Sequence, residues 1–325
     1  MDESSRHIKN GAKGKLTQEK GYMDSAAKAN KRMKGPVVPL NLCFDEAGNL
    51  DHDAIAAYVD WLAGEGTPIL LLTYGSSEYA CLDDEDIWAL TRTLGQANAG
   101  RSFCIGATGF WKPGKTRDYL AHAKDVGMDA VKVQINPYLG NTTPVLINYF
   151  DALEGAVDMP LLLWAGGQPL FPKEAAVELA QRPQIIGMKN DGDQFYDYYD
   201  LIRQTREQDF GVISGGQMRN FAFGYPLGSP AYLCTVAPFR PDIANAFYQC
   251  LVEDDAAGAW DYVFRYEEPW LQWAIQHNWL ASVKAAIQLK GLYPNHRLGP
   301  PNPAPEEGLL DGVRTLFADI YQGAF

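Results

Sequence analysis

The segment QIIGMKNDGDQF, residues 184–195, is the most informative part of the sequence for both fold and function. The apolar residues before Lys189 predict a short buried strand, and a polar turn that contains glycine follows it. Lys189 ends this strand, where an unpaired ammonium group would be costly to bury. We therefore expect either a structural cation paired with Asp191 or Asp193, or an amine kept neutral so that it can attack a carbonyl carbon.

Seven further apolar runs of strand length occupy residues 36–41, 68–73, 102–107, 130–136, 160–165, 210–214 and 231–235. Stretches with the apolar spacing of helices separate them, although the segment after 210–214 is short and contains glycine, so that helix is less clear. This alternation predicts an α/β fold, a (β/α)₈ TIM barrel with a C-terminal helical extension. The alternative, a doubly wound open sheet, usually carries a glycine-rich phosphate loop after its first strand, and no G-x-G-x-x-G is present there.

Three regions follow from charge and periodicity. Residues 1–34 hold nine Lys/Arg and four Asp/Glu with almost no apolar periodicity, which predicts a basic extension, flexible or loosely docked, or an arm docked at a subunit interface. Residues 35–240 form the predicted barrel. Residues 241–325 lose the strand pattern and are expected to be helices that complete and extend it.

The composition of the 325 residues limits the classes of partner. A formal net charge of -12 argues against nucleic acid and anionic membranes as partners. No apolar run is long enough to cross a bilayer. The five cysteines form no C-x-x-C pair and the five histidines no metal-binding spacing, so we expect reduced thiols, a cytoplasmic protein and no metal site.

Functional residues of TIM barrels lie at the C-terminal ends of the strands and in the loops that follow. This rule selects Lys189 together with residues 73–79, 136–141, 164–168 and 233–241. Lys132 is the competing lysine, because its alternation with valine neighbours turns it toward the barrel interior. It comes early in its strand, so we expect it toward the end of the barrel opposite the site.

Several of these segments resemble the dihydrodipicolinate synthase and N-acetylneuraminate lyase family of class I aldolases. The similar segments, in chain order, are GPVVPLNLCFDEAGNLD, YGSSEYACLDDED, INPYLG, MPLLLWAGG, IIGMKNDGD, VISGG and SVKAAIQLKGLYPNHRLGPPNPAPEE. The resemblance implies that Lys189 forms an imine with the carbonyl carbon of a 2-oxo acid. It also implies that no cofactor is needed, because the imine itself accepts electrons, and that the chain forms a homo-oligomer, a dimer or tetramer.

The loop after the second strand is implied to bind the carboxylate of the 2-oxo acid. Aligning Glu78 with the glutamate of the family motif places Gly75 and Ser76 at its two threonine positions; shifting the gap places Ser76 and Ser77 there. Serine hydroxyls can make the same hydrogen bonds. The carbonyl group of Leu233 matches a backbone contact of the family site.

The sequence departs from the family at its proton-transferring tyrosines. Trp164 stands where the first is expected and Leu139 where the second is expected, and neither side chain can transfer protons near neutral pH. The arginine that dihydrodipicolinate synthases use has no counterpart in residues 164–171, so authentic dihydrodipicolinate synthase activity is not expected. Tyr74, which replaces a family glycine, and the retained Tyr138 are candidate proton carriers, although Tyr74 could equally pack in the barrel wall.

The sequence thus predicts a class I (Schiff-base) lyase or hydro-lyase that acts on a 2-oxo acid such as pyruvate or a deoxy-2-oxo sugar acid. A related reaction with a different proton carrier is a second interpretation. The loss of two tyrosines leaves a third, a non-catalytic or regulatory protein that binds a 2-oxo acid on an aldolase scaffold.

Overall fold

A computed structural model describes residues 24–140, 142–164, 171–191 and 195–321. Within these ranges, eight parallel strands pair in chain order and close into a barrel. The strands are β1 (Gly35–Pro39), β2 (Ile69–Leu71), β3 (Phe103–Ala107), β4 (Ala130–Gln134), β5 (Leu161–Trp164), β6 (Ile185–Asn190), β7 (Gly211–Ser214) and β8 (Ala231–Leu233). The predicted TIM barrel is therefore confirmed.

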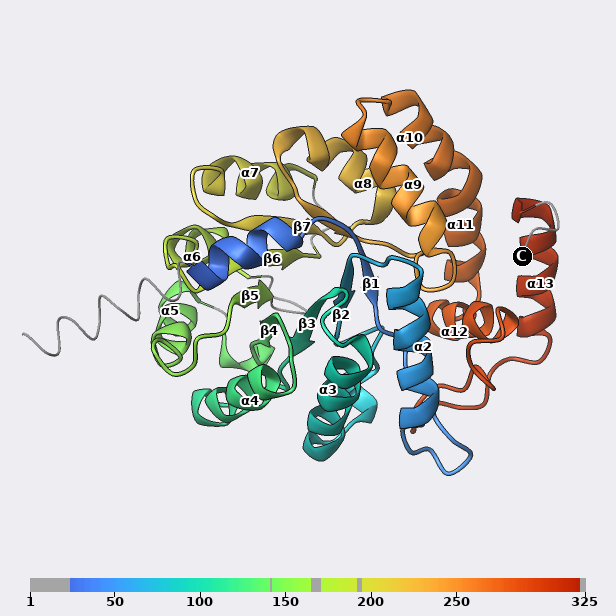
Figure 1. Ribbon diagram of the computed structural model, residues 1–325, viewed down its shortest axis with the longest axis horizontal. Coiled ribbons are helices and arrows are strands. Elements are labelled where there is room, and N and C mark those ends of the chain that lie inside the picture. The colour runs from blue at the N-terminus through green and yellow to red at the C-terminus, as the bar shows by residue number, and fades with distance from the viewer. Residues whose placement is uncertain (1–23, 141, 165–170, 192–194, 322–325) are drawn as a thin grey trace, which may run out of the picture.

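Helices surround the barrel and continue beyond it, with the last five gathered on one side (Figure 1). They are α2 (His52–Gly64), α3 (Asp84–Asn98), α4 (Pro113–Asp125), α5 (Thr143–Asp151), α6 (Lys173–Leu179), α7 (Phe195–Thr205), α8 (Gln217–Gly224), α9 (Pro241–Val252), α10 (Ala256–Tyr262), α11 (Glu268–Gln276), α12 (Trp279–Leu289) and α13 (Leu309–Tyr321). The unclear segment after the seventh strand forms α8. None of the described helices is both long and apolar enough to cross a membrane.

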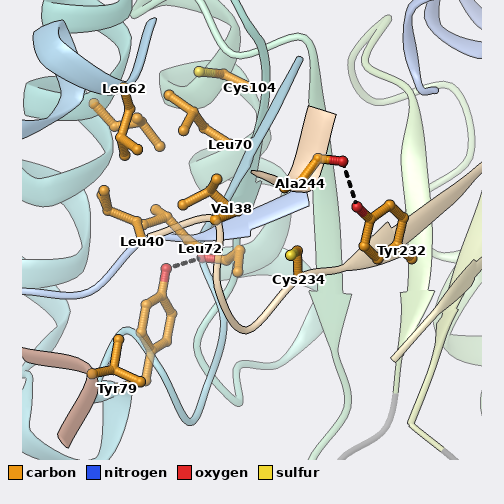
Figure 2. Close-up of a cluster of buried hydrophobic side chains, with 14 of the residues drawn as sticks. Val38, Leu40, Leu62, Leu70, Leu72, Tyr79, Cys104, Tyr232, Cys234 and Ala244 are labelled. Carbon is orange, nitrogen blue, oxygen red and sulfur yellow. Dashed lines mark hydrogen bonds between the residues drawn. The ribbon is translucent and has the colours of Figure 1, made fainter. Parts of the chain in front are cut away.

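Two layers of apolar side chains hold the barrel together. The inner layer fills the barrel with side chains from successive strands, including Val37, Ile105, Leu162 and Ile213. The outer layer lies between the strands and the helices, and Figure 2 shows part of it. Buried tyrosine hydroxyls in this layer donate hydrogen bonds to backbone carbonyl groups, as Tyr232 does to Ala244 at 2.9 Å. Both faces of each strand are thus buried, as expected for a parallel sheet covered by helices.

The described end of the N-terminal extension, residues 24–34, is ordered and packs on the barrel. Residues 24–32 form a helix, drawn in blue beside β6 and β7 in Figure 1. Ala26, Ala29 and Met33 pack against the inner apolar layer of the same chain. Arg32 adds an ion pair to Asp129 at 2.5 Å. Burial of these small apolar side chains, spaced one turn apart, fixes a segment whose overall composition suggested disorder; residues 1–23 lie outside the described residues.

A buried carboxyl group supports the start of α8. Glu267 is the last residue of a π-helical turn, η4 (Val263–Glu267), and is fully buried. Its carboxylate accepts hydrogen bonds from the backbone N–H groups of Met218 at 2.9 Å and Arg219 at 3.2 Å. Burial is the largest influence on this group and raises its pKa to about 7.

Substitution of Glu267 is expected to change how stability depends on pH. Because the pKa in the folded state lies above the ordinary value of 4.5, the folded state binds the extra proton between these values. The stabilisation is therefore complete below pH 4.5 and is lost as pH rises through about 7, by roughly 3 kcal/mol in total. As the pH is raised from 5 to 8.5, the free energy of unfolding of Glu267→Gln should rise relative to that of the unmodified chain by roughly this amount, as measured by denaturant titrations. Exposed Glu307→Gln is the control, and an equal pH dependence in both variants would contradict the assignment.

Candidate active site

A cavity of about 630 Å³ opens at the carboxyl ends of the strands. Its described lining consists of Thr73, Tyr74, Gly75, Ser76, Phe110, Asn136, Pro137, Tyr138, Trp164, Lys189, Asp191 and Leu233. Eight residues were expected from the sequence to act in catalysis or substrate binding. Seven of them line this cavity, and Ser77 is the exception; the seven are Tyr74, Gly75, Ser76, Tyr138, Trp164, Lys189 and Leu233. Phe110, which sequence reasoning missed, follows β3, so the rule that selected the other strand ends could have found it.

An irregularity in β6 turns Lys189 into the barrel. Ile186 belongs to the inner layer, and strict alternation from it would point Lys189 outward. The pairing with β5 shifts by one residue, however, so that Leu162 lies opposite Gly187 and Met188 faces the outer layer. Lys189 then pairs with Ile213 of the inner layer. This bulge re-aims the lysine side chain, a common role of bulges near active sites.

Lys189 forms an ion pair with Asp191, one of the two acidic partners considered from the sequence. The second oxygen of the Asp191 carboxylate accepts a hydrogen bond from the indole N–H of Trp164. Burial acts to raise the pKa of Asp191, but the charge and hydrogen bond of Lys189, the Trp164 N–H and the charge of Lys132 together hold it below its usual value. Asp191 thus links Lys189 to Trp164, the residue that the sequence resemblance places where the family tyrosine is expected. Asp193 lies outside the described residues.

Lys132 lies much closer to the site than its position in the sequence suggested. It is the third residue of β4 and is fully buried, and its Nζ atom is 4.1 Å from the centre of the Trp164 ring. The same amine donates a hydrogen bond to Gln134 Oε1 at 3.0 Å. Burial, followed by the charge of Lys189, lowers the pKa of Lys132 well below its ordinary value. The expectation that Lys132 belongs to the opposite end of the barrel is corrected, because the short strands leave it directly beneath Trp164.

Ser76 and Ser77, in the loop after β2, could not be distinguished from the sequence, but they have different surroundings in the structure. The Ser77 hydroxyl is buried, donates to the Leu40 carbonyl at 2.6 Å and accepts from the Thr73 N–H at 3.0 Å. Ser77 is therefore engaged in holding the loop and does not line the cavity. Ser76 does line it, with its N–H bonded to Thr73 Oγ1 at 3.0 Å. This geometry favours the alignment that places Gly75 and Ser76 at the cavity.

A buried ion pair holds the end of this loop in place. Glu78 has left-handed backbone geometry, with φ of 45°, and its carboxylate faces Lys284 of α12 at 2.8 Å. The exposed fractions of the two side chains are 1% and 0%. The carboxylate also accepts the Gly299 N–H at 2.8 Å. Burial raises the pKa of Glu78 and lowers that of Lys284, so each charge depends on the other.

Aromatic rings form much of the cavity wall. The Tyr74 ring centre lies 4.9 Å from that of Phe110 and 6.3 Å from that of Trp164. Tyr138, in the short turn η2 (Pro137–Leu139), is 96% exposed at the mouth of the cavity. Leu139, which the sequence resemblance places where the second family tyrosine is expected, is half exposed. Leu233 ends β8 and completes the described apolar lining.

Comparisons with known proteins agree with the fold and show the family. A "probable 5-dehydro-4-deoxyglucarate dehydratase 2" of Streptomyces avermitilis is 24% identical over 255 residues, which cover 76% of this chain and 76% of the relative. A 4-hydroxy-tetrahydrodipicolinate synthase of Nitrosospira multiformis is 27% identical over 234 residues, covering 71% and 77% of the two chains. The crystal structure of YagE from E. coli K12 superposes with a TM-score of 0.79 at 23% identity, covering 89% of this chain and 98% of YagE.

The family model described as the dihydrodipicolinate synthetase family matches residues 32–316, which is most of the sequence. This match confirms the resemblance found in the strand-end segments, and it places the protein among lyases. The chain belongs to the dihydrodipicolinate synthetase family.

Proposed function

We propose that the protein is a class I lyase in which Lys189 forms an imine with the carbonyl carbon of a 2-oxo acid and Asp191 carries the protons. The observation that carries this proposal is the position of Lys189 in the cavity, turned inward by the bulge and in contact with a carboxylate. Relatives named as dehydratases or synthases support the reaction class. YagE, a similar fold, was crystallised in complex with pyruvate.

Formation of the imine can proceed without a net change in protons. Asp191 takes one proton from the Lys189 ammonium group, and the neutral amine then attacks the carbonyl carbon. As the carbinolamine forms, the amine nitrogen loses a second proton and the former carbonyl oxygen gains one. Protonated Asp191 then delivers its proton to that hydroxyl group, which leaves as water and gives the iminium ion. Loss of the Lys189 charge removes a main influence that lowers the pKa of Asp191, so burial helps the acid to keep its proton until this step.

Asp191 is a better candidate for proton transfer than the aromatic residues of the wall. It contacts Lys189 directly, whereas Tyr74 packs its ring between Phe110 and Trp164. The indole of Trp164 cannot exchange a proton near neutral pH, but its N–H holds Asp191 in position. We propose that the Ser76 hydroxyl, with backbone N–H groups of its loop, binds the substrate carboxylate.

Exchange of the methyl protons of pyruvate tests this chemistry without knowledge of a second substrate. The iminium ion acidifies the C3 protons, so in D₂O the methyl proton signal of pyruvate should disappear with enzyme present, and Lys189→Met should abolish the effect. The rate is measured by proton NMR. If pyruvate protects the protein against thermal unfolding and no exchange occurs, the scaffold binds the acid without activating it, and the proposal fails.

Gly215, directly after β7, leaves the space that the Asp191 carboxylate occupies. A Cβ atom at this position would overlap Asp191 Oδ1 and lie 2.5 Å from the carbonyl oxygen of Asn190. Gly215→Ala is therefore expected to displace Asp191 and to slow pyruvate proton exchange roughly 100-fold, with a loss of roughly 1–3 kcal/mol in stability. Gly114→Ala on α4, with no atom within 4 Å, is the matched control and should leave both unchanged. Equal exchange rates in the two variants would argue against the role of Asp191.

A further inference from the structure

The cavity is larger than a three-carbon acid needs. At about 630 Å³ it falls in the range of sites for ligands of drug size, roughly 300–1,000 Å³. If Lys189 holds the carbonyl carbon and the loop at Ser76 holds the carboxylate, the remaining space must contain the rest of the substrate. The residues around this space therefore determine which substituents the 2-oxo acid carries.

Four of the described lining residues carry aromatic rings: Tyr74, Phe110, Tyr138 and Trp164. Tyr74 contacts Phe110 and Trp164 ring to ring, and Tyr138 and Leu233 also line the cavity. Such rings favour a planar apolar group, which can pack offset or edge-on against them. The exposed ring of Tyr138 lies at the mouth, where it can cover a group that projects from the cavity.

Charged and polar groups suited to a hydroxylated or doubly acidic tail are few among the described lining residues. The charged side chains there are Lys189 and Asp191, and they pair with each other. Thr73 Oγ1 accepts the Ser76 N–H, and Asn136 Oδ1 accepts the backbone N–H of Tyr138 at 3.0 Å. A chain of hydroxyl groups would have to share the few remaining donors, such as the Thr73 hydroxyl and the Asn136 amide, whereas an apolar ring gains from burial against the aromatic wall without needing partners.

We propose that the substrate is a 2-oxo acid whose C4 atom carries an aromatic ring, namely a 4-aryl-4-hydroxy-2-oxobutanoate. This inference rests on the proposed imine at Lys189. In the iminium ion, the Asp191 carboxylate takes the proton of the C4 hydroxyl, the C3–C4 bond breaks, and its electron pair moves into the imine to give the enamine and an aryl aldehyde. Asp191 returns the proton to C3, and water hydrolyses the resulting imine to release pyruvate and regenerate the Lys189 amine.

Parallel kinetics on two 4-hydroxy-2-oxo acids test the substituent. Pyruvate release is measured for 4-hydroxy-4-phenyl-2-oxobutanoate and for a 2-oxo-3-deoxy sugar acid of six carbons. We expect kcat/KM to be at least about tenfold higher for the phenyl compound, because its ring can contact the aromatic side chains of the cavity. Phe110→Ala should reduce this ratio, whereas Phe264→Ala, an exposed phenylalanine outside the cavity lining, should leave it unchanged.

The outcomes separate the substituent from the underlying chemistry. A sugar acid cleaved as fast as or faster than the phenyl compound would overturn the aromatic assignment, and so would turnover of neither compound by an enzyme that still exchanges the protons of pyruvate. Absence of pyruvate exchange would instead remove the imine on which the inference rests, and with it both proposals. A phenyl preference that depends on Phe110 supports the inference.

Discussion

Asp191→Asn is expected to lower turnover roughly 100- to 10,000-fold, the range that general acid–base groups contribute. Asparagine keeps the size of the side chain and can still bond the Trp164 N–H, but it can neither take a proton from Lys189 nor return one. The loss should therefore appear in kcat rather than in pyruvate binding. Steady-state kinetics and pyruvate exchange in D₂O measure it.

The Asp200–Lys173 ion pair offers a matched control for this variant. Its atoms are 2.9 Å apart and both side chains are about one-third exposed. Lys173 lines a smaller cavity beside Asp191, but Asp200 lines neither that cavity nor the one that holds Trp164. Asp200→Asn should leave turnover unchanged. Should Asp191→Asn retain turnover within about threefold of the unmodified enzyme, another group must carry the protons, because a true acid–base residue contributes far more.

Lys284→Met is expected to destabilise the protein by about 3–5 kcal/mol, because it leaves the Glu78 carboxylate buried without its counter-charge. The Glu78 carboxylate also accepts a hydrogen bond from the Gly299 N–H, and Glu78 directly follows Ser76 and Ser77 in the sequence. The variant should therefore unfold earlier in urea and bind 2-oxo acids more weakly. Chemical denaturation at pH 8 measures the first effect.

The double variant Glu78→Gln, Lys284→Met shows how much of the lost stability comes from the unpaired Glu78 charge and how much from the altered packing of residue 284. Glutamine at position 78 is neutral and still accepts the Gly299 N–H, so the double variant should recover much of the stability lost in Lys284→Met. Lys173→Met, which breaks an ion pair whose side chains are about one-third exposed, should cost less than about 1 kcal/mol. A similar small cost for Lys284→Met would mean that the buried pair contributes little.

Much of the fold could be predicted because the barrel repeats one simple pattern. Short apolar runs that are buried on both faces, separated by amphipathic stretches, identify the strands in order. The acidic start of α3, for example, forms the expected cap, with Asp83 and Asp86 bonding reciprocally to each other's backbone N–H groups. Helix α8 was less clear because it is short and begins after two glycines, and its support comes from Glu267, which is distant in the sequence.

The details of the site depended on geometry that sequence patterns do not contain. The bulge at Ile186 reverses the alternation that would otherwise point Lys189 outward. The glycine inside this strand, Gly187, is a sequence signal that could have indicated the bulge, but it does not show how the side chains are re-aimed. Ser77 could be separated from Ser76 only by its contact with Leu40, which follows the neighbouring strand β1. Lys132 reaches Trp164 because the strands are short and Lys132 lies two residues before Gln134, the strand partner of Trp164.

The imine at Lys189 is the central claim, and reductive trapping tests it most directly. The enzyme is treated with pyruvate and sodium borohydride, digested, and the modified lysine is located by peptide mass spectrometry. Lys132 is the second lysine that could react, because burial lowers its pKa and its amine lies against the Trp164 ring. We expect the reduced pyruvate adduct on the peptide that contains Lys189, and none in Lys189→Arg. An adduct on Lys132, or bound pyruvate with no adduct on any lysine, would contradict the account.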